Sequence, residues 1–266
     1  MYKVDYHHHS KFSFDGKDFM EDICKSAIEK NLSEICFTEH FDVDPKDVSY
    51  GFLDYEKYHE TIEMCRQKYG DKLKIKRGLE IGEPHLSLYV KDLERELSKM
   101  NLDFIIGSVH NLNSVKLRLT MPGKDVEQIY KDYFTEILSM VKVADIDIIG
   151  HLDLMKRYAF KEYGNYNFKD FEEIITEILQ IAIKRNIGIE LNTSGFRNSV
   201  KEIYPKIEVI KLYKKLGGEI VTIGSDSHSC VDTFSGCEEG YNILKKIGFK
   251  YIYTFENRKP IKHELN

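Results

Sequence analysis

The residues with the clearest chemistry lie between Asp5 and Ser10, where three consecutive histidines follow a short apolar opening. Successive side chains of an extended strand alternate between faces, so we expect His7 and His9 to project together and His8 to point away. Two imidazoles on one face can bind one metal ion when other elements supply further ligands. A polar N-terminus or an affinity-tag remnant is the alternative, but a tag would carry more histidines. We therefore interpret this segment as part of a metal site.

Further candidate ligands follow later apolar runs of the chain. They are His40, Glu80, His110, His151, Asp226 and His228, and Asp15 lies in the loop after the first run. A single histidine after an apolar run is more often a hydrogen-bonded core residue, but six at equivalent places favour metal binding. Glu80 is a lone acid in an apolar run, and its burial calls for a cationic partner. Nitrogen and oxygen ligands without a thiolate suit two or three ions of zinc, manganese or iron.

Metal ions bound close together would favour the hydrolysis of a phosphate ester. Two ions about 3.5–4 Å apart lower the pKa of a shared water and stabilise both the attacking and the leaving oxygen. A carboxylate such as Glu80 can bridge two ions of this kind. The ligand types therefore indicate metal-assisted phosphate hydrolysis.

The elements that must position these residues alternate between apolar strands and amphipathic helices. We expect strands at residues 2–9, 34–37, 74–81, 104–109, 146–149, 188–191 and 219–223. We expect helices at residues 18–31, 54–69, 85–100, 125–143, 167–186, 202–216 and 235–247, the last followed by Gly248 as a cap. This alternation favours a parallel α/β barrel of seven or eight units, with an open doubly wound sheet as the alternative. A barrel would place functional residues at the carboxyl ends of its strands, where the candidate ligands fall.

Composition limits the class of protein and its partners. No linker or repeat divides the chain, so residues 1–266 are predicted to form a single domain. A net charge of −5 disfavours long nucleic acid but not a small phosphorylated metabolite. The chain shows no apolar run long enough for a membrane span and no leader, so we expect a cytoplasmic protein. The five cysteines show no CxxC spacing and are interpreted as reduced thiols. The oligomeric state cannot be inferred.

Together the motifs resemble those of a known family. They are His7-x-His9, Thr38-Glu39-His40, Gly78-Leu79-Glu80, Gly107-Ser108-Val109-His110, Gly150-His151-Leu152-Asp153 and Gly224-Ser225-Asp226-Ser227-His228. This set resembles the polymerase and histidinol phosphatase (PHP) superfamily of metal-dependent phosphoesterases, and within it the histidinol-phosphate phosphatase branch of histidine biosynthesis. The resemblance implies a distorted (β/α)7 TIM-like barrel with a trinuclear metal centre at its rim.

The resemblance also implies which residues hold each ion. The first ion would be held by His7, His9, Glu80 and Asp226; the second by Glu80, His110 and His151; the third by Asp15, His40 and His228. Other branches of the family often carry histidine at the position of Asp15. We expect a hydroxide bridging the first two ions to attack phosphorus in line, without a phosphoenzyme. No serine or cysteine nucleophile with a matching base is needed, although Cys230 lies near the site in the sequence.

Residues for the substrate follow from their place after strands. Arginine pairs well with phosphate oxygens, so Arg197 and Arg157 are expected in rim loops as a clamp, with Lys156 as the alternative to Arg157. Asp153 is interpreted as a general acid for the leaving alkoxide or as an orienting partner of a ligating histidine. Asp5 is either a partner of a ligand or a satisfied buried acid. Asp42 and Phe41 are candidates for binding the amine and imidazole of the substrate, and the acidic loop at 41–53 is expected to cover the mouth.

Three other functions fit part of the pattern. Another phosphoesterase of the same superfamily, acting on phosphotyrosine or a nucleotide phosphate, would keep every ligand and change only the rim loops. An amidohydrolase also uses a His-x-His barrel, but would usually carry a bridging lysine in place of Glu80. A non-catalytic metal-binding module would be expected to lack one or more ligands, and none is missing here.

Overall fold

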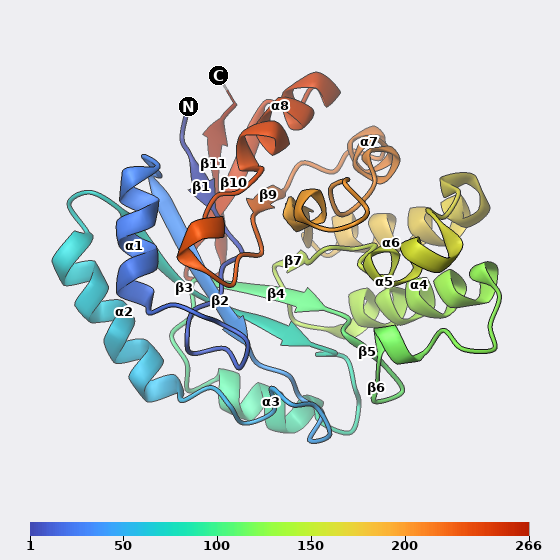
Figure 1. Ribbon diagram of the computed structural model, residues 1–266, viewed down its shortest axis with the longest axis horizontal. Coiled ribbons are helices and arrows are strands. Elements are labelled where there is room, and N and C mark those ends of the chain that lie inside the picture. The colour runs from blue at the N-terminus through green and yellow to red at the C-terminus, as the bar shows by residue number, and fades with distance from the viewer. Residues whose placement is uncertain (266) are drawn as a thin grey trace.

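The computed structural model describes residues 1–265 and is built around a sheet of seven parallel strands (Figure 1). In sheet order these are β1 (Val4–Asp5), β2 (Glu34–His40), β3 (Lys74–Gly82), β4 (Phe104–Ser108), β7 (Ile148–Ile149), β8 (Gly188–Asn192) and β9 (Val221–Gly224). Backbone hydrogen bonds also join the two outer strands, because Tyr6 N donates to Ile223 O at 2.9 Å and Asp226 N to His7 O at 2.8 Å. The sheet is therefore a nearly closed barrel. The prediction of a seven-unit barrel is confirmed, and the open doubly wound alternative is wrong.

Helices surround this barrel (Figure 1). They are α1 (Met20–Glu29), α2 (Tyr55–Tyr69), α3 (Val90–Leu97), α4 (Val126–Val143), α5 (Met155–Tyr163), α6 (Glu172–Lys184), α7 (Ile207–Lys215) and α8 (Cys237–Ile247). All except α5 were expected from the sequence. The helix expected from residue 202 begins only at Ile207, because a residue that precedes a proline, here Tyr204, is disfavoured in the helical region. Gly248 follows α8 with a φ of +94°, as its role as a cap requires.

Two hairpins were not expected from the sequence. The short hairpin of β5 (Asn111–Leu112) and β6 (Val115–Lys116) lies after β4, and β10 (Tyr251–Glu256) pairs with β11 (Lys259–Glu264) near the C-terminus. The second hairpin covers the N-terminal end of the barrel, where Phe255 N donates to Tyr6 Oη at 2.9 Å and the Phe104 and Phe255 rings are 4.8 Å apart. The hairpin therefore packs against the end of the barrel opposite to the carboxyl ends of the strands.

The barrel strands are buried throughout most of their length, and apolar side chains fill the space between them and the helices. Single 3-10 turns interrupt the loops: η1 (Leu117–Leu119), η2 (Phe168–Phe171), η3 (Ser194–Arg197) and η4 (Cys230–Asp232). All five cysteines are free thiols. Across residues 1–265, none of the helices combines the length and the apolar character that crossing a bilayer needs.

Candidate metal centre

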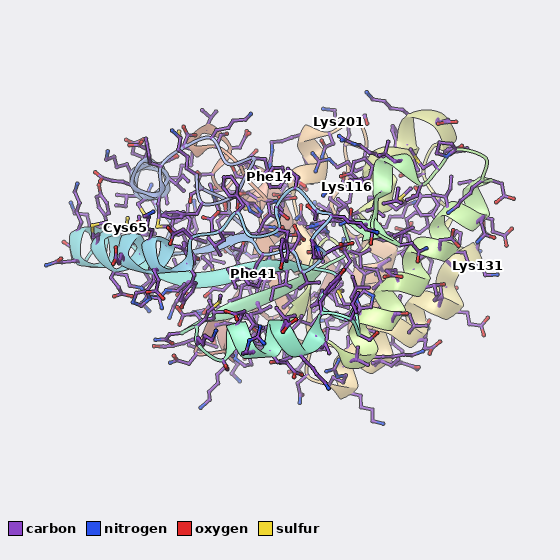
Figure 2. The ribbon with its side chains drawn as sticks, turned by 90° about the horizontal axis from the view of Figure 1, so that it is seen from below. Phe14, Phe41, Cys65, Lys116, Lys131 and Lys201 are labelled. Atoms are coloured by element: carbon purple, nitrogen blue, oxygen red, sulfur yellow. The ribbon has the colours of Figure 1, made fainter. Side chains whose placement is uncertain are left out.

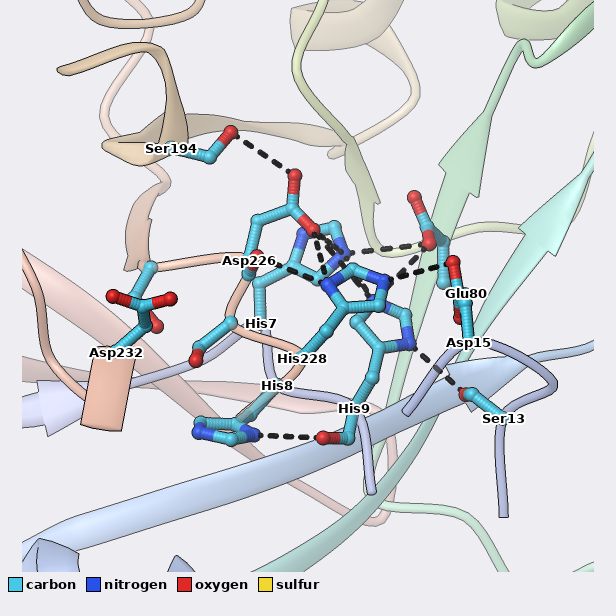
Figure 3. A network of polar contacts seen from close by, with 12 residues as sticks. His7, His8, His9, Ser13, Asp15, Glu80, Ser194, Asp226, His228 and Asp232 are labelled. Carbon is cyan, nitrogen blue, oxygen red and sulfur yellow. Dashed lines mark hydrogen bonds and ion pairs between the residues drawn. The ribbon is translucent and has the colours of Figure 1, made fainter. Parts of the chain in front are cut away.

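The structure brings all nine predicted ligands to the C-terminal rim of the barrel, although they come from six different strands and their loops. His7, His9 and Asp15 follow β1, His40 ends β2, Glu80 lies on β3, His110 follows β4, His151 follows β7, and Asp226 and His228 follow β9. Figure 3 shows the central members of this group facing one another. The rim position follows from the parallel sheet, because the carboxyl ends of parallel strands meet at one edge.

The His-x-His motif points into this group as its alternation predicts. His7 Nε2 and His9 Nε2 lie 3.1 Å apart, and Glu80 Oε2 lies 3.4 Å from the first and 3.5 Å from the second. Asp226 Oδ1 is 3.8 Å from both nitrogens. His8 points away from the group (Figure 3), with its Nε2 at 2.9 Å from Thr233 Oγ1. The four atoms converge as the ligands of one cation would.

Glu80 faces a second set of histidines with its other oxygen. Its Oε1 lies 2.8 Å from His151 Nε2 and 3.2 Å from His110 Nε2, and it also accepts a hydrogen bond from Ser108 Oγ at 2.6 Å. One carboxylate oxygen therefore faces each histidine pair. This is the arrangement in which a carboxylate can bridge two ions.

The third set lies nearer to solvent. Asp15 Oδ1 is 3.6 Å from His40 Nε2, and Asp15 Oδ2 is 3.3 Å from His228 Nε2. The ring of His9 stacks between the rings of His40 and His228, with centroids 4.3 and 4.2 Å away. The side chains of Asp15 and His228 are 39% and 26% exposed, whereas those of Glu80 and His7 are at most 1% exposed. The third position is thus the most open of the three.

The charge balance of the group fits divalent cations. Within the described chain, no lysine or arginine lies within ion-pair distance of Glu80 or Asp226, so histidines are their only cationic partners. Burial alone would raise the pKa of Glu80, but His7 and His110 outweigh it and hold that pKa well below its usual range. Burial would lower the pKa of His40, but Asp15 and Glu80 raise it to about 10. In the metal-free protein, protons on histidine supply positive charge that bound metal ions would supply instead.

Hydrogen bonds behind the histidines leave their Nε2 atoms free for a metal. His7 Nδ1 donates to Glu190 Oε1 at 2.7 Å, and the second oxygen of Glu190 accepts from His151 N at 2.7 Å. Ser13 Oγ donates to Glu39 Oε2 at 2.6 Å, so it accepts from His9 Nδ1 at 3.1 Å. A protonated Nδ1 leaves the lone pair of Nε2 directed at the centre.

Glu190 and Glu39 were not identified as site residues from the sequence. Both are acids in fully buried strands, β8 and β2, which is the signal that marked Glu80. The same reasoning about a lone buried acid would have found Glu190.

Asp42 and Phe41 differ in where the structure places them. Asp42 lines the cavity beside the metal group, and its Oδ1 lies 3.4 Å from His110 Nδ1, so it orients His110 in the way that Glu190 orients His7. Phe41 packs against the hydrophobic core and is absent from the cavity wall among the described residues. The prediction that Phe41 contacts the substrate is therefore not supported by its position.

A cavity of about 310 Å³ opens over the ligands. Its wall contains three cationic side chains, Lys116, Arg118 and Arg157, of which only Arg157 was expected. Figure 2 shows Phe14 and Lys116 near each other toward the middle of that view, and both line this cavity. Lys116 also pairs with Asp47 of the loop at 41–53, and Val48 of that loop lines the cavity, so the loop borders the mouth. Lys116 and Arg118 carried no sequence signal, because neither the β5–β6 hairpin, which ends at Lys116, nor the following turn η1, which contains Arg118, was predicted.

The two arginines predicted to clamp phosphate both lie at the rim. Arg157 belongs to the first turn of α5, not to a loop as expected, and lines the cavity next to Asp226 and His228. Arg197, in η3, donates from Nη2 to Ser225 O at 2.6 Å and to Asp226 O at 3.1 Å. A second hollow at the rim is lined by both arginines. The structure thus places them on the same side of the metal group.

Three other predicted residues do not face the cavity. Asp153 is fully buried and accepts hydrogen bonds from Tyr166 Oη and Lys206 N, each at 2.9 Å, so its position does not support the role of general acid. Within residues 1–265 it has no hydrogen bond to a candidate ligand. Lys156 is also fully buried and cannot replace Arg157. Asp5 accepts hydrogen bonds from Ser225 and Phe234 N and is a satisfied buried acid.

Cys230 also lies away from the site. It lies in η4 and is not part of the wall of either rim cavity among the described residues. Its position does not support a role as nucleophile.

Comparison with known proteins agrees with this geometry. The family model described as PHP domain matches residues 5–194. A histidinol-phosphatase from Lactococcus lactis is 30% identical over 269 residues, which cover 99% of this chain and 98% of that protein. A histidinol-phosphatase from Bacillus subtilis is 26% identical and is matched over 87% of this chain and 96% of its own length.

Comparison with solved structures also finds similar proteins. The crystal structure of the Lactococcus lactis histidinol phosphate phosphatase, complexed with zinc, L-histidinol and phosphate, superposes with a TM-score of 0.91 at 29% identity and covers 98% of this chain and 99% of that one. A protein from Listeria monocytogenes superposes with a TM-score of 0.74 at 22% identity over 89% of this chain and 99% of that one, which shows the shared fold.

Proposed function

The chain belongs to the PHP domain family, and we propose that it is a metal-dependent histidinol-phosphatase that hydrolyses L-histidinol phosphate to L-histidinol and phosphate. The observation that carries this proposal is the placement of Glu80, whose two oxygens face two separate histidine pairs on the floor of a cavity lined with cations. Full-length similarity to a protein that binds zinc, L-histidinol and phosphate supports the choice of substrate. The reaction belongs to histidine biosynthesis, and we expect it in the cytoplasm.

We assign two or three divalent ions to the site, with zinc, manganese and iron as candidates. His7, His9, Glu80 and Asp226 would hold the first ion, Glu80, His110 and His151 the second, and Asp15, His40 and His228 the third. His40 Nδ1 lies 3.1 Å from Glu80 Oε2, whereas the buried Nδ1 atom of His151 lacks a hydrogen-bond partner among the described residues, which an ordered water would supply. Bound ions would activate a water and neutralise the charge that develops on the phosphoryl oxygens.

The chain's own residues then bind and orient the ester. Arg157 and Arg197 are assigned to the phosphate group, because a guanidinium fork matches two phosphate oxygens. An oxygen from water bonds to phosphorus as the bond between phosphorus and the alcohol oxygen breaks, and one proton of that water ends on the alcohol. No residue needs to carry a phosphoryl group. A cavity of about 310 Å³ suits a small metabolite better than a nucleic acid strand.

The test is phosphate release by protein reconstituted with zinc, manganese or iron. We expect a kcat/KM for L-histidinol phosphate of roughly 10⁴ M⁻¹s⁻¹ or more, well above that for phosphotyrosine or a 3′-phosphorylated nucleotide. A preference for phosphotyrosine or the nucleotide would assign another phosphoesterase reaction to the same centre. Absence of turnover on all three at full metal occupancy would overturn the proposal in favour of a non-catalytic metal-binding module.

A further inference from the structure

A buried ion pair lies behind the rim, outside both rim cavities. Lys156 Nζ is 3.2 Å from Asp153 Oδ2, and the side chains of both residues have no solvent exposure. Lys156 is in the first turn of α5, and Asp153 is in the turn before it. The pair thus belongs to the segment 151–157, which begins with a candidate ligand and ends with Arg157.

The partners of this pair come from a different rim segment. Lys156 Nζ donates to Ile203 O at 2.6 Å, and Asp153 Oδ2 accepts from Lys206 N at 2.9 Å. Ile203 and Lys206 lie in the segment 193–206 between β8 and α7, which carries Arg197. The ion pair therefore joins the segment that carries one arginine to the segment that carries the other.

Further contacts hold Asp153 and Lys156 in place. Tyr166 Oη donates to Asp153 Oδ2 at 2.9 Å, the Tyr204 ring lies 5.0 Å from Lys156 Nζ, and Glu202 Oε2 lies 3.6 Å from it. Tyr204 is itself paired with Asn192 at the end of β8 through two backbone hydrogen bonds of 2.7 and 2.9 Å. The segment 193–206 is thus fixed to the barrel at Tyr204, and to the segment 151–157 at Ile203 and Lys206.

An ion pair in this position is not explained by stability alone. Desolvation of two charges offsets most of their attraction, and apolar residues of similar volume are often at least as stable in the same place. What an ion pair adds is a defined geometry, because its hydrogen bonds fix which groups meet. Here the groups that meet are two backbone atoms of the segment that carries Arg197.

We propose that Asp153 and Lys156 are positioning residues that hold Arg157 and Arg197 in register on the phosphate side of the metal centre. They act on the substrate only through these arginines, which line the same rim hollow. The choice of substrate in this inference rests on the proposed function, whereas the link between the two rim segments does not. The pair is a brace between two rim segments whether or not the substrate is L-histidinol phosphate.

The first test replaces Lys156 by methionine, which keeps much of the side-chain length and removes the charge. Because the arginines bind phosphate in the ground state as well as in the transition state, the KM for L-histidinol phosphate should rise about tenfold while kcat stays within about threefold. The affinity of the zinc-loaded protein for inorganic phosphate, measured by calorimetry, should fall by a similar factor. Zinc content, measured by elemental analysis, should not change.

The double variant Asp153→Asn/Lys156→Met separates positioning from stability. Lys156→Met alone leaves a buried carboxylate without its cation, which lowers Tm, and removal of both charges should restore Tm. A brace predicts that KM stays raised in the double variant, since the link to Ile203 is still missing. Return of KM to the wild-type value together with Tm would overturn the proposal.

A matched control lies at the other end of the barrel, where Arg258 pairs with the buried Asp147 at 2.6 Å. Arg258→Met should lower Tm without changing KM or phosphate affinity. If it raised KM as Lys156→Met does, the effect would be a general result of instability, and the brace would be rejected.

Hydrogen exchange of the metal-free protein gives a readout that needs no activity. Residues 194–206 should exchange faster in Lys156→Met than in the wild type, and residues on α2 should be unchanged. If the wild type hydrolyses no phosphate monoester but this exchange increases, the proposed function fails and the brace stands. If the wild type is active and Lys156→Met changes neither KM, phosphate affinity nor exchange, the brace alone is overturned.

Discussion

The two ends of the barrel bury acids in opposite ways. At the N-terminal end, Asp147 accepts from Ile105 N at 2.7 Å and pairs with Arg258 at 2.6 Å, and Asp103 accepts from Arg77 N at 3.0 Å and from Arg66 at 2.8 Å. At the C-terminal rim, the ion-pair partners of Glu80 and Asp226 in the described structure are histidines. The charge of a buried acid that pairs with an arginine is already balanced. Histidines that balance the charge of a buried acid can instead release their protons when a metal ion binds.

Buried charges at the N-terminal end therefore serve the fold, whereas those at the rim serve chemistry. The hairpin β10–β11 brings Arg258 to the N-terminal end, where its guanidinium pairs with Asp147. At the rim, the arginines lie at the edge of a cavity instead of against the acids.

Glu80→Gln should have the largest effect on activity. The substitution keeps the size of the side chain but removes the charge that faces both histidine pairs. We expect kcat/KM for phosphate release to fall by at least about 10³-fold, because metal ions supply several kcal/mol of transition-state stabilisation. Far-UV circular dichroism should remain that of the wild type. Wild-type rates in defined metal buffer would contradict a bridging role.

The sequence predicted the barrel and the nine candidate ligands because most of these ligands follow an apolar run, Glu80 is a lone acid within one, and parallel strands end at one edge. It did not predict how side chains in the rim segments are directed. Asp153 and Lys156 have the residue types of an active site, but the turn before α5 and the first turn of α5 place their side chains in the protein interior. Lys116 and Arg118 reach the cavity from the β5–β6 hairpin and from the turn η1 that follows it, neither of which was predicted. Such directions depend on contacts between segments far apart in the chain, which local patterns do not encode.

Removal of metal should affect stability as well as turnover. An ion that binds only the folded state at about 100 times its Kd stabilises that state by about 2.7 kcal/mol. Dialysis against a chelator should therefore abolish turnover and lower Tm, and addition of zinc or manganese should restore both. In Glu80→Gln the same addition should raise Tm much less. An equal rise in both proteins would place the stabilising ion elsewhere.

Glu190→Gln should have a smaller effect on the same site. It weakens the acceptor for His7 Nδ1 but removes no candidate ligand. Loss of a hydrogen-bond partner behind a metal ligand typically lowers metal affinity or activity by about 10- to 100-fold. Competition with a chromophoric chelator would measure this change. An effect as large as that of Glu80→Gln would indicate that Glu190 itself binds an ion.

Arg258→Met should lower stability and leave turnover unchanged, because it breaks the pair at the end of the barrel without a metal site. Loss of a charged partner of a buried group costs about 2 kcal/mol, which denaturant unfolding would measure. The cost should depend on pH. Burial raises the pKa of Asp147 to about 6 even with Arg258 present, above the value of about 3.9 in an unfolded chain. The contribution of Asp147 to the free energy of unfolding therefore falls as pH rises from about 3.9 to about 6.

Without Arg258, the pKa of Asp147 should rise further, because the guanidinium is the main influence that lowers it against burial. The loss of stability in the variant should then be largest near about pH 8, where the Asp147 carboxylate must be charged. It should be smaller near about pH 5, where Asp147 binds a proton. A pH-independent loss would mean that Arg258 contributes through packing and not through charge. A loss of turnover in this variant would show that the two ends of the barrel are coupled. It would contradict the view that buried acids at the N-terminal end serve stability alone and those at the rim serve metal binding.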